Sequence, residues 1–188
     1  MESLMRCEFV KIKKLLALAL SAVMAVSMLT ACGGGGKAGS LNLSEVNNVI
    51  SEYGGETRVK NSNTLNNALR SVADTLQKNG TYTTDAGTAA LEEIRGYPIQ
   101  ENGNNWVREI SGGVMVLSDA ELKAEGMTAE DAVGIMIAAV EYGLDEQLAG
   151  FQNLDFTIVF YAGATTVTAE NGTLYWVIGY EFDMKASA

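Results

Sequence analysis

Two stretches near the C-terminus decide the fold: FTIVFYAG at Phe156–Gly163 and NGTLYWVIGYEF at Asn171–Phe182. Both are rich in the β-branched and aromatic residues that favour strands. Asn171-Gly172 is the dipeptide most typical of a two-residue hairpin turn, which predicts that Val167 faces Thr173 across a hairpin. The expected strands of this tail are Phe156–Tyr161, Val167–Glu170 and Thr173–Phe182.

Side chains alternate between the two faces of a strand, which assigns a face to each residue of the tail. One face is expected to carry the apolar side chains of Phe156, Ile158, Phe160, Leu174, Trp176 and Ile178. Two upstream segments with apolar residues at helical spacing, Leu65–Leu76 and Val133–Val140, are expected to cover that face. Tyr175 points to the opposite face, which is expected to be wetter.

The segments upstream of the tail are mostly helical in pattern. Ser118 with Glu121, and Thr128 with Asp131, have the spacing of a capping box, so a helix is expected to begin at each place. Further helices are expected from Ser44 to Gly54, from Asn63 or Thr64 to Asn79, over Thr88–Arg95 and from Thr128 to Gly143, with strands at Trp106–Ile110 and Val114–Leu117. The chain shows no second linker after Leu41. It therefore predicts one α+β domain, with helices packed on an antiparallel sheet.

The N-terminus has the pattern of an export signal. The basic segment Lys11–Lys14 precedes an apolar run, LLALALSAVMAVSM at Leu15–Met28, which is shorter than the about 20 residues of a spanning helix. The tetrapeptide Leu29-Thr30-Ala31-Cys32 resembles the bacterial lipobox. That resemblance implies cleavage before Cys32 and attachment of lipid to its thiol. A plain signal peptide or a membrane anchor with an incidental Cys is the alternative.

This leader divides the chain into three parts. Residues 1–31 are expected to be a lipoprotein signal peptide, residues 32–40 a lipidated Cys32 with a Gly-rich tether, and residues 41–188 the folded domain. The protein is then expected on the cell membrane, held by its lipid on the extracytoplasmic face. Met1 and Met5 both fit as the initiator.

The composition restricts the chemistry. The 188 residues include no His and two Cys, and they carry a net charge of −10. The lack of His excludes a Ser-His-Asp triad, a Cys-His dyad and an imidazole-bound metal. The acidic balance argues against nucleic acid as a partner, since its recognition needs a basic face. We therefore expect no catalytic residue set, no cofactor and no metal site.

Acidic and aromatic side chains are the remaining candidates for a site. The acidic clusters lie mostly at expected helix starts or on polar faces, where structural roles are favoured. They are Glu92-Glu93, Asp119/Glu121/Glu125, Glu130-Asp131 and Asp145-Glu146. Aromatic side chains in the strands could line a ligand groove, and about half of them should belong to the core. Among these, Trp106 and Tyr175 are expected to face a ligand.

Three stretches, taken in order, resemble the CAP superfamily of cysteine-rich secretory proteins, antigen 5 and plant pathogenesis-related proteins. They are LNNALRSVADTLQKNG at Leu65–Gly80, GMTAEDAVGIMIAAVEYG at Gly126–Gly143, and the two stretches of the tail. The resemblance implies an α-β-α sandwich. The family's cleft of two His and two Glu does not carry over, because this chain has no His. Tyr142 occupies the position of the second His, so it is the third residue expected to face a ligand.

Three functions stay open on this pattern. The first is a lipid-anchored binding or interaction module without catalysis, whose partner is an extracellular protein, a glycan or a small molecule. The second is a cell-envelope hydrolase working with carboxylates alone, which needs two acids on opposite walls of one cleft. The third is a small solute-binding lipoprotein, for which the 157 residues left after removal of residues 1–31 from 188 are short.

Overall fold

The computed structural model describes residues 40–187, apart from 98, 103–105 and 152–153. Its helices are α2 (Leu43–Glu52), α3 (Asn63–Asn79), α4 (Thr84–Arg95), α5 (Asp119–Ala124) and α6 (Ala129–Leu148). Its strands are β1 (Lys60–Asn61), β2 (Ile99–Asn102), β3 (Trp106–Ser118), β4 (Asp155–Thr168) and β5 (Leu174–Ser187). They form a sheet in the order β1-β4-β5-β3-β2, in which β1 is parallel to β4 and the other pairs are antiparallel. The expected α+β domain, with helices packed on a mainly antiparallel sheet, is confirmed.

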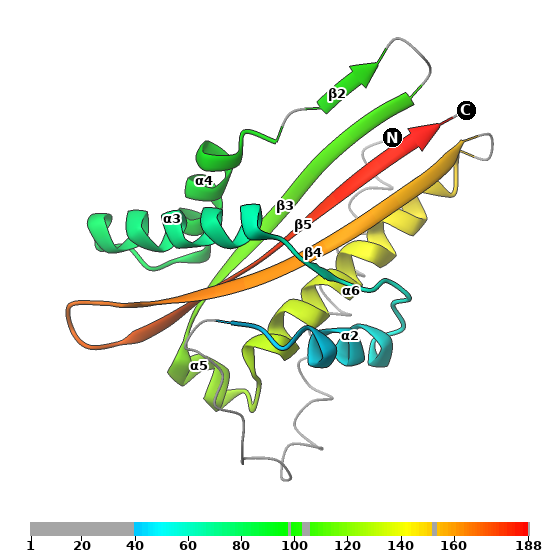
Figure 1. Cartoon of the computed structure of the whole chain (residues 1–188). Coiled ribbons are helices and arrows are strands. Elements are labelled where there is room, and N and C mark those ends of the chain that lie inside the picture. The colour runs from blue at the N-terminus through cyan, green and yellow to red at the C-terminus, as the bar shows by residue number, and fades with distance from the viewer. Residues whose placement is uncertain (1–39, 98, 103–105, 152–153, 188) are drawn as a thin grey trace, which may run out of the picture.

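Helices cover both faces of this sheet (Figure 1). α3 and α4 lie on one face, which we call the α3 face, and α2 and α6 lie on the other, the α6 face. β5 runs through the centre and pairs with β3 on one side and β4 on the other along almost its whole length. Within the described ranges, no helix is long and apolar enough to cross a bilayer.

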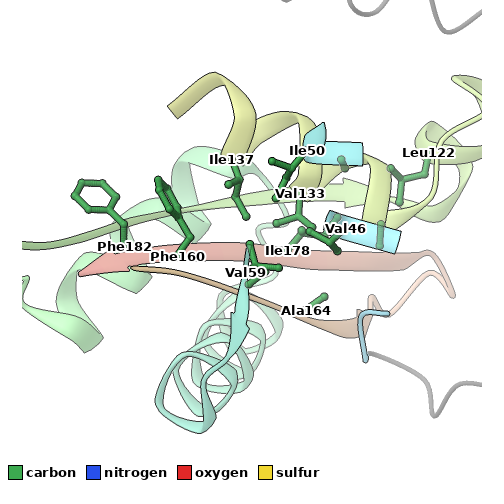
Figure 2. Close-up of a cluster of buried hydrophobic side chains, with 13 residues drawn as sticks. Val46, Ile50, Val59, Leu122, Val133, Ile137, Phe160, Ala164, Ile178 and Phe182 are labelled. Carbon is green, nitrogen blue, oxygen red and sulfur yellow. The ribbon is translucent and has the colours of Figure 1, made fainter. Parts of the chain in front are cut away.

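The α6 face carries the larger cluster of buried side chains. Figure 2 shows Val46 of α2 and Val133 and Ile137 of α6 lying over Ile178 and Phe160 of the sheet. All five are at most 2% exposed. The alternation expected along the tail is therefore correct for Phe160 and Ile178, and α6 covers them as expected.

The expectation that Tyr175 lies on a wetter face was wrong. α3 covers that face with Leu65, Leu69 and Val72, which belong to a second cluster with Val177. The reason is visible in β5 itself, where the consecutive residues Val177 and Ile178 are both 0% exposed. Since neighbouring residues of a strand point to opposite faces, β5 needs an apolar layer on each side, and α3 and α6 supply one each.

Two glycines allow α3 to approach the sheet closely. Gly163 of β4 and Gly179 of β5 face each other across the strands. A Cβ atom at Gly179 would lie 2.6 Å from Cδ2 of Leu69, and one at Gly163 would overlap the side-chain oxygen of Asn66. The absence of both Cβ atoms leaves the space that Leu69 fills.

The capping boxes predicted for the middle of the chain are confirmed. Ser118 caps α5 together with Glu121, and Thr128 caps α6 together with Asp131. Other boundaries differ from those expected. Asn42 rather than Ser44 caps α2, α4 begins four residues early after its cap Thr83, and α6 continues past Gly143 to Leu148. The helix expected from Asn63 or Thr64 to Asn79 is confirmed as α3, with Ser62 as its cap. Gly143 is not among the glycines with positive φ, so it does not take the left-handed conformation with which a glycine commonly ends a helix.

The strands are longer than expected. Pairing with β5 carries β3 straight through Gly112-Gly113, and it joins the two strands expected around Phe156 and Val167 into β4. The two-residue turn was wrong. Thr168 pairs with Leu174, so five residues connect the strands, and Val167 faces Tyr175 instead of Thr173. Gly172 still provides the left-handed conformation of the connection, with φ 84°.

Replacement of Phe160 by Ala tests the α6-face cluster. Phe160 is 2% exposed, so we expect Phe160→Ala to lower the free energy of unfolding by about 3–5 kcal/mol, because a large buried aromatic leaves a cavity. Phe151→Ala is the matched control. Its side chain is 56% exposed, and we expect a change of only about 0.5 kcal/mol. Urea titration at low protein concentration measures both, and equal losses would contradict the assigned burial.

A pair of glycine substitutions tests the packing of α3. Gly179→Ala places a methyl group against Leu69 and should cost about 1–3 kcal/mol. Gly143→Ala, in α6, meets nothing within 4 Å and should stabilise the protein by about 0.5–1 kcal/mol through helix propensity. Thermal melting of the two variants should therefore shift in opposite directions. A stabilised Gly179→Ala protein would show that α3 does not lie this close to the sheet.

Candidate functional site

Charged side chains gather on the α3 face of the sheet beyond the C-terminal end of α4. Glu181 and Asp183 are two residues apart on β5, so both point to this face. Arg95 pairs with Glu181, and Arg108 of β3 pairs with Asp183. We call these four residues and Tyr97 the ion-pair network.

The pair of Arg95 and Glu181 is the more buried one. Nε of Arg95 donates to Oε1 of Glu181 at 2.5 Å, and the Glu181 side chain is only 4% exposed. Gly96, in the left-handed conformation, ends α4 directly after Arg95. A carboxylate buried this far loses its hydration, which costs several kcal/mol unless a counter-charge is in contact. Arg95 supplies that charge.

Arg108 and Asp183 form a two-pronged ion pair. Nε of Arg108 donates to Oδ1 of Asp183 at 2.8 Å, and Nη2 donates to Oδ2 at 2.7 Å. This fork matches the geometry of a carboxylate, so both oxygens are occupied. The hydrogen bonds from Arg108 hold the pKa of Asp183 below its ordinary value. Asp183 is therefore a stable anion at neutral pH.

Tyr97 fills the space between the strand and the end of α4. A Cβ atom at Gly112, the residue opposite Glu181 on β3, would lie 2.8 Å from the Tyr97 hydroxyl oxygen, so only a glycine leaves room there. Cζ of Arg95 lies 5.9 Å from the centre of the Tyr97 ring. The hydroxyl is buried beside Arg95 and Glu181, and within the described part of the chain it makes no hydrogen bond of good geometry. Burial, followed by the charge of Glu181, raises the pKa of Tyr97, so the ring stays neutral.

The chemistry of the ion-pair network follows from its charges. Two guanidinium groups face two carboxylates, so the charges compensate. Acid catalysis by a carboxyl group needs a raised pKa, and the pKa of Asp183 is lowered instead. The network therefore suits polar recognition or the support of the sheet better than proton transfer. In the sequence, its signal is the presence of two acidic residues, Glu181 and Asp183, in a strand that is mostly apolar.

The three residues predicted to face a ligand do not share a site. Trp106 and Tyr175 lie at opposite ends of the sheet, since Trp106 pairs with Ser187 and Tyr175 pairs with Ser118. Tyr175 is half-buried and stacks on Tyr82 with ring centres 4.8 Å apart. The side chain of Trp106 lies outside the described residues, as does Cys32.

Tyr142, the third of these residues, is on α6. Its side chain is 52% exposed, and its hydroxyl donates to Oε1 of Glu146 one turn later at 2.9 Å. Phe151 follows the end of this helix and is 56% exposed. These are the two most exposed large apolar side chains of the described residues. We use the name distal surface for these two residues together with Leu154, 36% exposed, and Phe156, whose ring contacts Phe151 edge-on at 6.4 Å, because all four lie in the segment from the last turns of α6 to the start of β4.

Several members of the acidic clusters have structural contacts, as expected. Glu121 and Asp131 complete capping boxes, and Asp119 pairs with Lys123. Oε1 of Glu130 accepts a hydrogen bond from the backbone N–H of Asn42 at 2.9 Å. Glu141, outside these clusters, accepts from the backbone N–H groups of Glu56 and Thr57 and so fixes the loop after α2. In the described ranges, no group of three or more acidic or cysteine side chains is placed to hold a metal ion.

The lowered pKa of Asp183 predicts acid sensitivity. In the unfolded chain this carboxyl takes up its proton near pH 3.9, whereas in the folded protein it does so at lower pH. The unfolded state therefore binds more protons in that interval, and the stabilisation is present above about pH 4 and is lost as the pH falls below it. Asp183→Asn should lower the melting temperature at pH 7 and flatten its decline below about pH 5. Asp74→Asn, an exposed carboxylate on α3, is the control, and an equal effect there would contradict this role of Asp183.

Comparison with known proteins adds no further residues to the candidate site. No family model, curated protein or solved structure matches the chain. The resemblance of three stretches to the CAP superfamily therefore stays a prediction, and the site rests on the contacts described above.

Proposed function

We propose that the protein is a lipid-anchored binding module on the extracytoplasmic face of the cell membrane, without catalytic activity of its own. The leader supports the anchor, because a basic segment, a short apolar run and Leu29-Thr30-Ala31-Cys32 follow one another in the order of a lipoprotein signal. Residues 32–40, which include four consecutive glycines, would then be the tether between the lipid and the domain.

The observation that carries the binding role is the position of the distal surface. The domain starts next to the first turn of α6, where Asn42 is bonded to Glu130. Tyr142 and Phe151 lie in the last turns of α6 and directly after it. A helix of 20 residues is about 30 Å long, so Asn42, bonded at the first turn of α6, and Phe151, which follows its last turn, lie near opposite ends of this helix. Exposed apolar side chains mark protein-binding sites where they form a contiguous patch, and the contact of Phe151 with Phe156 supports such a patch here.

Charge supports the same orientation. Residues 32–188 hold 9 Lys or Arg and 21 Asp or Glu, which is a net charge of −12. Such a domain is repelled by an anionic membrane surface, so the domain would stand off the bilayer with its distal surface available. An interaction surface on so acidic a domain also restricts the partners to those that tolerate negative potential.

The two alternative functions have less support. A hydrolase would need one carboxyl group that keeps a proton near neutral pH. The two carboxylates that lie together on the α3 face, Glu181 and Asp183, are both held by arginines. A solute-binding lipoprotein of the usual kind has two lobes with a ligand between them, whereas the described fold is one domain around one sheet.

Substitution of Cys32 tests the anchor. In cells fed a labelled fatty acid, the wild-type chain should incorporate label and stay with the membrane, and Cys32→Ser should do neither. Cys7→Ser is the control, because residue 7 lies in the segment expected to be removed, and it should behave as wild type. Protease added to intact cells or spheroplasts should digest the domain if it lies outside. Equal labelling of wild type and Cys32→Ser would overturn the anchor.

A further inference from the structure

One edge of the sheet is largely open. β4 pairs with β5 over all 14 of its residues, but on its other side the two-residue strand β1 reaches only Tyr161 and Ala162. Among the residues that the structure describes, no strand therefore lies on the outer side of the stretch Asp155–Val159. Every second residue of an antiparallel strand points its N–H and C=O groups away from its partner, so this stretch presents unpaired backbone groups.

The open stretch of β4 lacks the devices that usually prevent edge pairing. It contains no Lys, no Arg and no Pro, and its register with β5 runs one to one without a bulge. The edge of β3 differs, because the side-chain oxygen of Thr84 accepts from the N–H of Val116 at 3.1 Å and lies 3.4 Å from its C=O. β2 covers the start of β3. Among the described residues, no strand therefore covers the backbone edge at the start of β4, whereas β2 and Thr84 cover the edge of β3.

Exposed apolar side chains adjoin the same stretch. Phe151 and Leu154 come just before β4 and are 56% and 36% exposed. Phe156, the second residue of β4, is half-buried and touches Phe151. An open edge and exposed apolar side chains are separate observations, and they adjoin each other at the start of β4.

We propose that a second copy of this chain pairs with β4 through Asp155–Val159, antiparallel and around a two-fold axis at Thr157. Thr157 is the midpoint of the open stretch, so pairing there uses all five residues of each copy. Phe156 then faces Ile158 of the second copy, and Asp155 faces Val159. Aromatic residues opposite β-branched ones, and Thr opposite Thr, are favourable cross-strand pairs.

This pairing is self-complementary, which favours a second copy over a foreign strand. The same five residues serve as both partners, as in a two-fold symmetric interface. It also brings Phe151 and Phe156 of the two copies to one side of the joined sheet, where they would bury each other's exposed surface. The inference deepens the proposed function by naming a partner for the distal surface, but it does not need the lipid anchor.

Charge sets the conditions under which the dimer forms. The chain carries a net charge of −10, so two copies repel each other at long range. The open stretch itself has one charged residue, Asp155, and in the proposed register it faces an apolar side chain. Salt screens the long-range repulsion and leaves the local contacts in place, so dimerisation should strengthen as ionic strength rises from 0.01 M to about 0.15 M.

A cysteine at the axis tests the register. Residues directly opposite in an antiparallel pair have Cβ atoms about 4.5–5.5 Å apart, close to the span of a disulfide. The full chain with Thr157→Cys, oxidised in cell membranes, should give a covalent dimer. Thr168→Cys is the matched control, because Thr168 is also an exposed threonine of β4, eleven residues further along. It should give no more dimer than wild type.

The outcomes separate this inference from the proposed function. Equal cross-linking at positions 157 and 168, or none at 157, would overturn the dimer. A covalent adduct of Thr157→Cys with a different protein alone would also overturn it, in favour of a foreign strand. Repeating the experiment in a Cys32→Ser chain distinguishes the two proposals, since a dimer without lipid supports the inference even if the anchor fails.

A charged edge gives an independent test. Thr157→Lys places two like charges opposite each other at the axis, while it lowers the overall negative charge that opposes association. We expect this variant to lose the dimer in sedimentation at 0.15 M salt and to melt at the temperature of the wild-type monomer. Thr168→Lys makes the same change of charge and should dimerise as wild type. Dimers of Thr157→Lys with undiminished affinity would contradict the proposed interface.

Discussion

The burial of β5 on both faces is the constraint on which the rest of the structure depends. Val177 and Ile178 are consecutive and both fully buried, so an apolar layer is required above and below the strand. α3 with α4 supplies one layer and α6 with α2 supplies the other. Polar groups on such a strand must be compensated locally, which explains why Glu181 lies against Arg95 and Asp183 against Arg108. The close approach of Leu69 to Gly163 and Gly179 follows from the same demand for a dense layer.

Local chemistry made part of this fold predictable from the sequence. The capping boxes at Ser118 and Thr128 depend on contacts three residues apart, and both are present as expected. The apolar residues at helical spacing in α3 likewise predict, from that helix alone, which of its sides is buried. The features that could not be predicted depend on strand pairing between residues that are far apart in the sequence. In the sequence, Gly112-Gly113 looks like the end of a strand. In the structure, pairing with β5, near the C-terminus, keeps both residues in β3.

The candidate site was harder to predict than the fold, for a physical reason. Alternation along a strand shows which residues share a face, but it does not show which helix covers that face. Tyr175 was therefore assigned to a wetter face, although α3 covers it. Phe151 gave no periodic signal at all, since it lies in the connection between α6 and β4. The arginine partners of Glu181 and Asp183 come from α4 and β3, at distances of 86 and 75 residues. The signal for these partners in the sequence was the presence of two acidic residues in a mostly apolar strand, where a charge without a partner is costly.

The arrangement of α2 has a mechanical consequence. α2 is the first helix that the structure describes, and it packs chiefly on α6, while the described strands of the sheet all come later in the chain. A force transmitted through residue 40 would therefore act first on α2 and on the bond between Asn42 and Glu130. The strands follow α2 in the chain, so the force would reach them only after it had acted on α2. The loop between α2 and β1 is also held, because Glu141 of α6 accepts hydrogen bonds from the backbone N–H groups of Glu56 and Thr57. In a protein held by its N-terminus, α2 would detach from α6 before the sheet unfolds. The domain could then extend under force by the unfolding of one helix while its β-sheet stays intact.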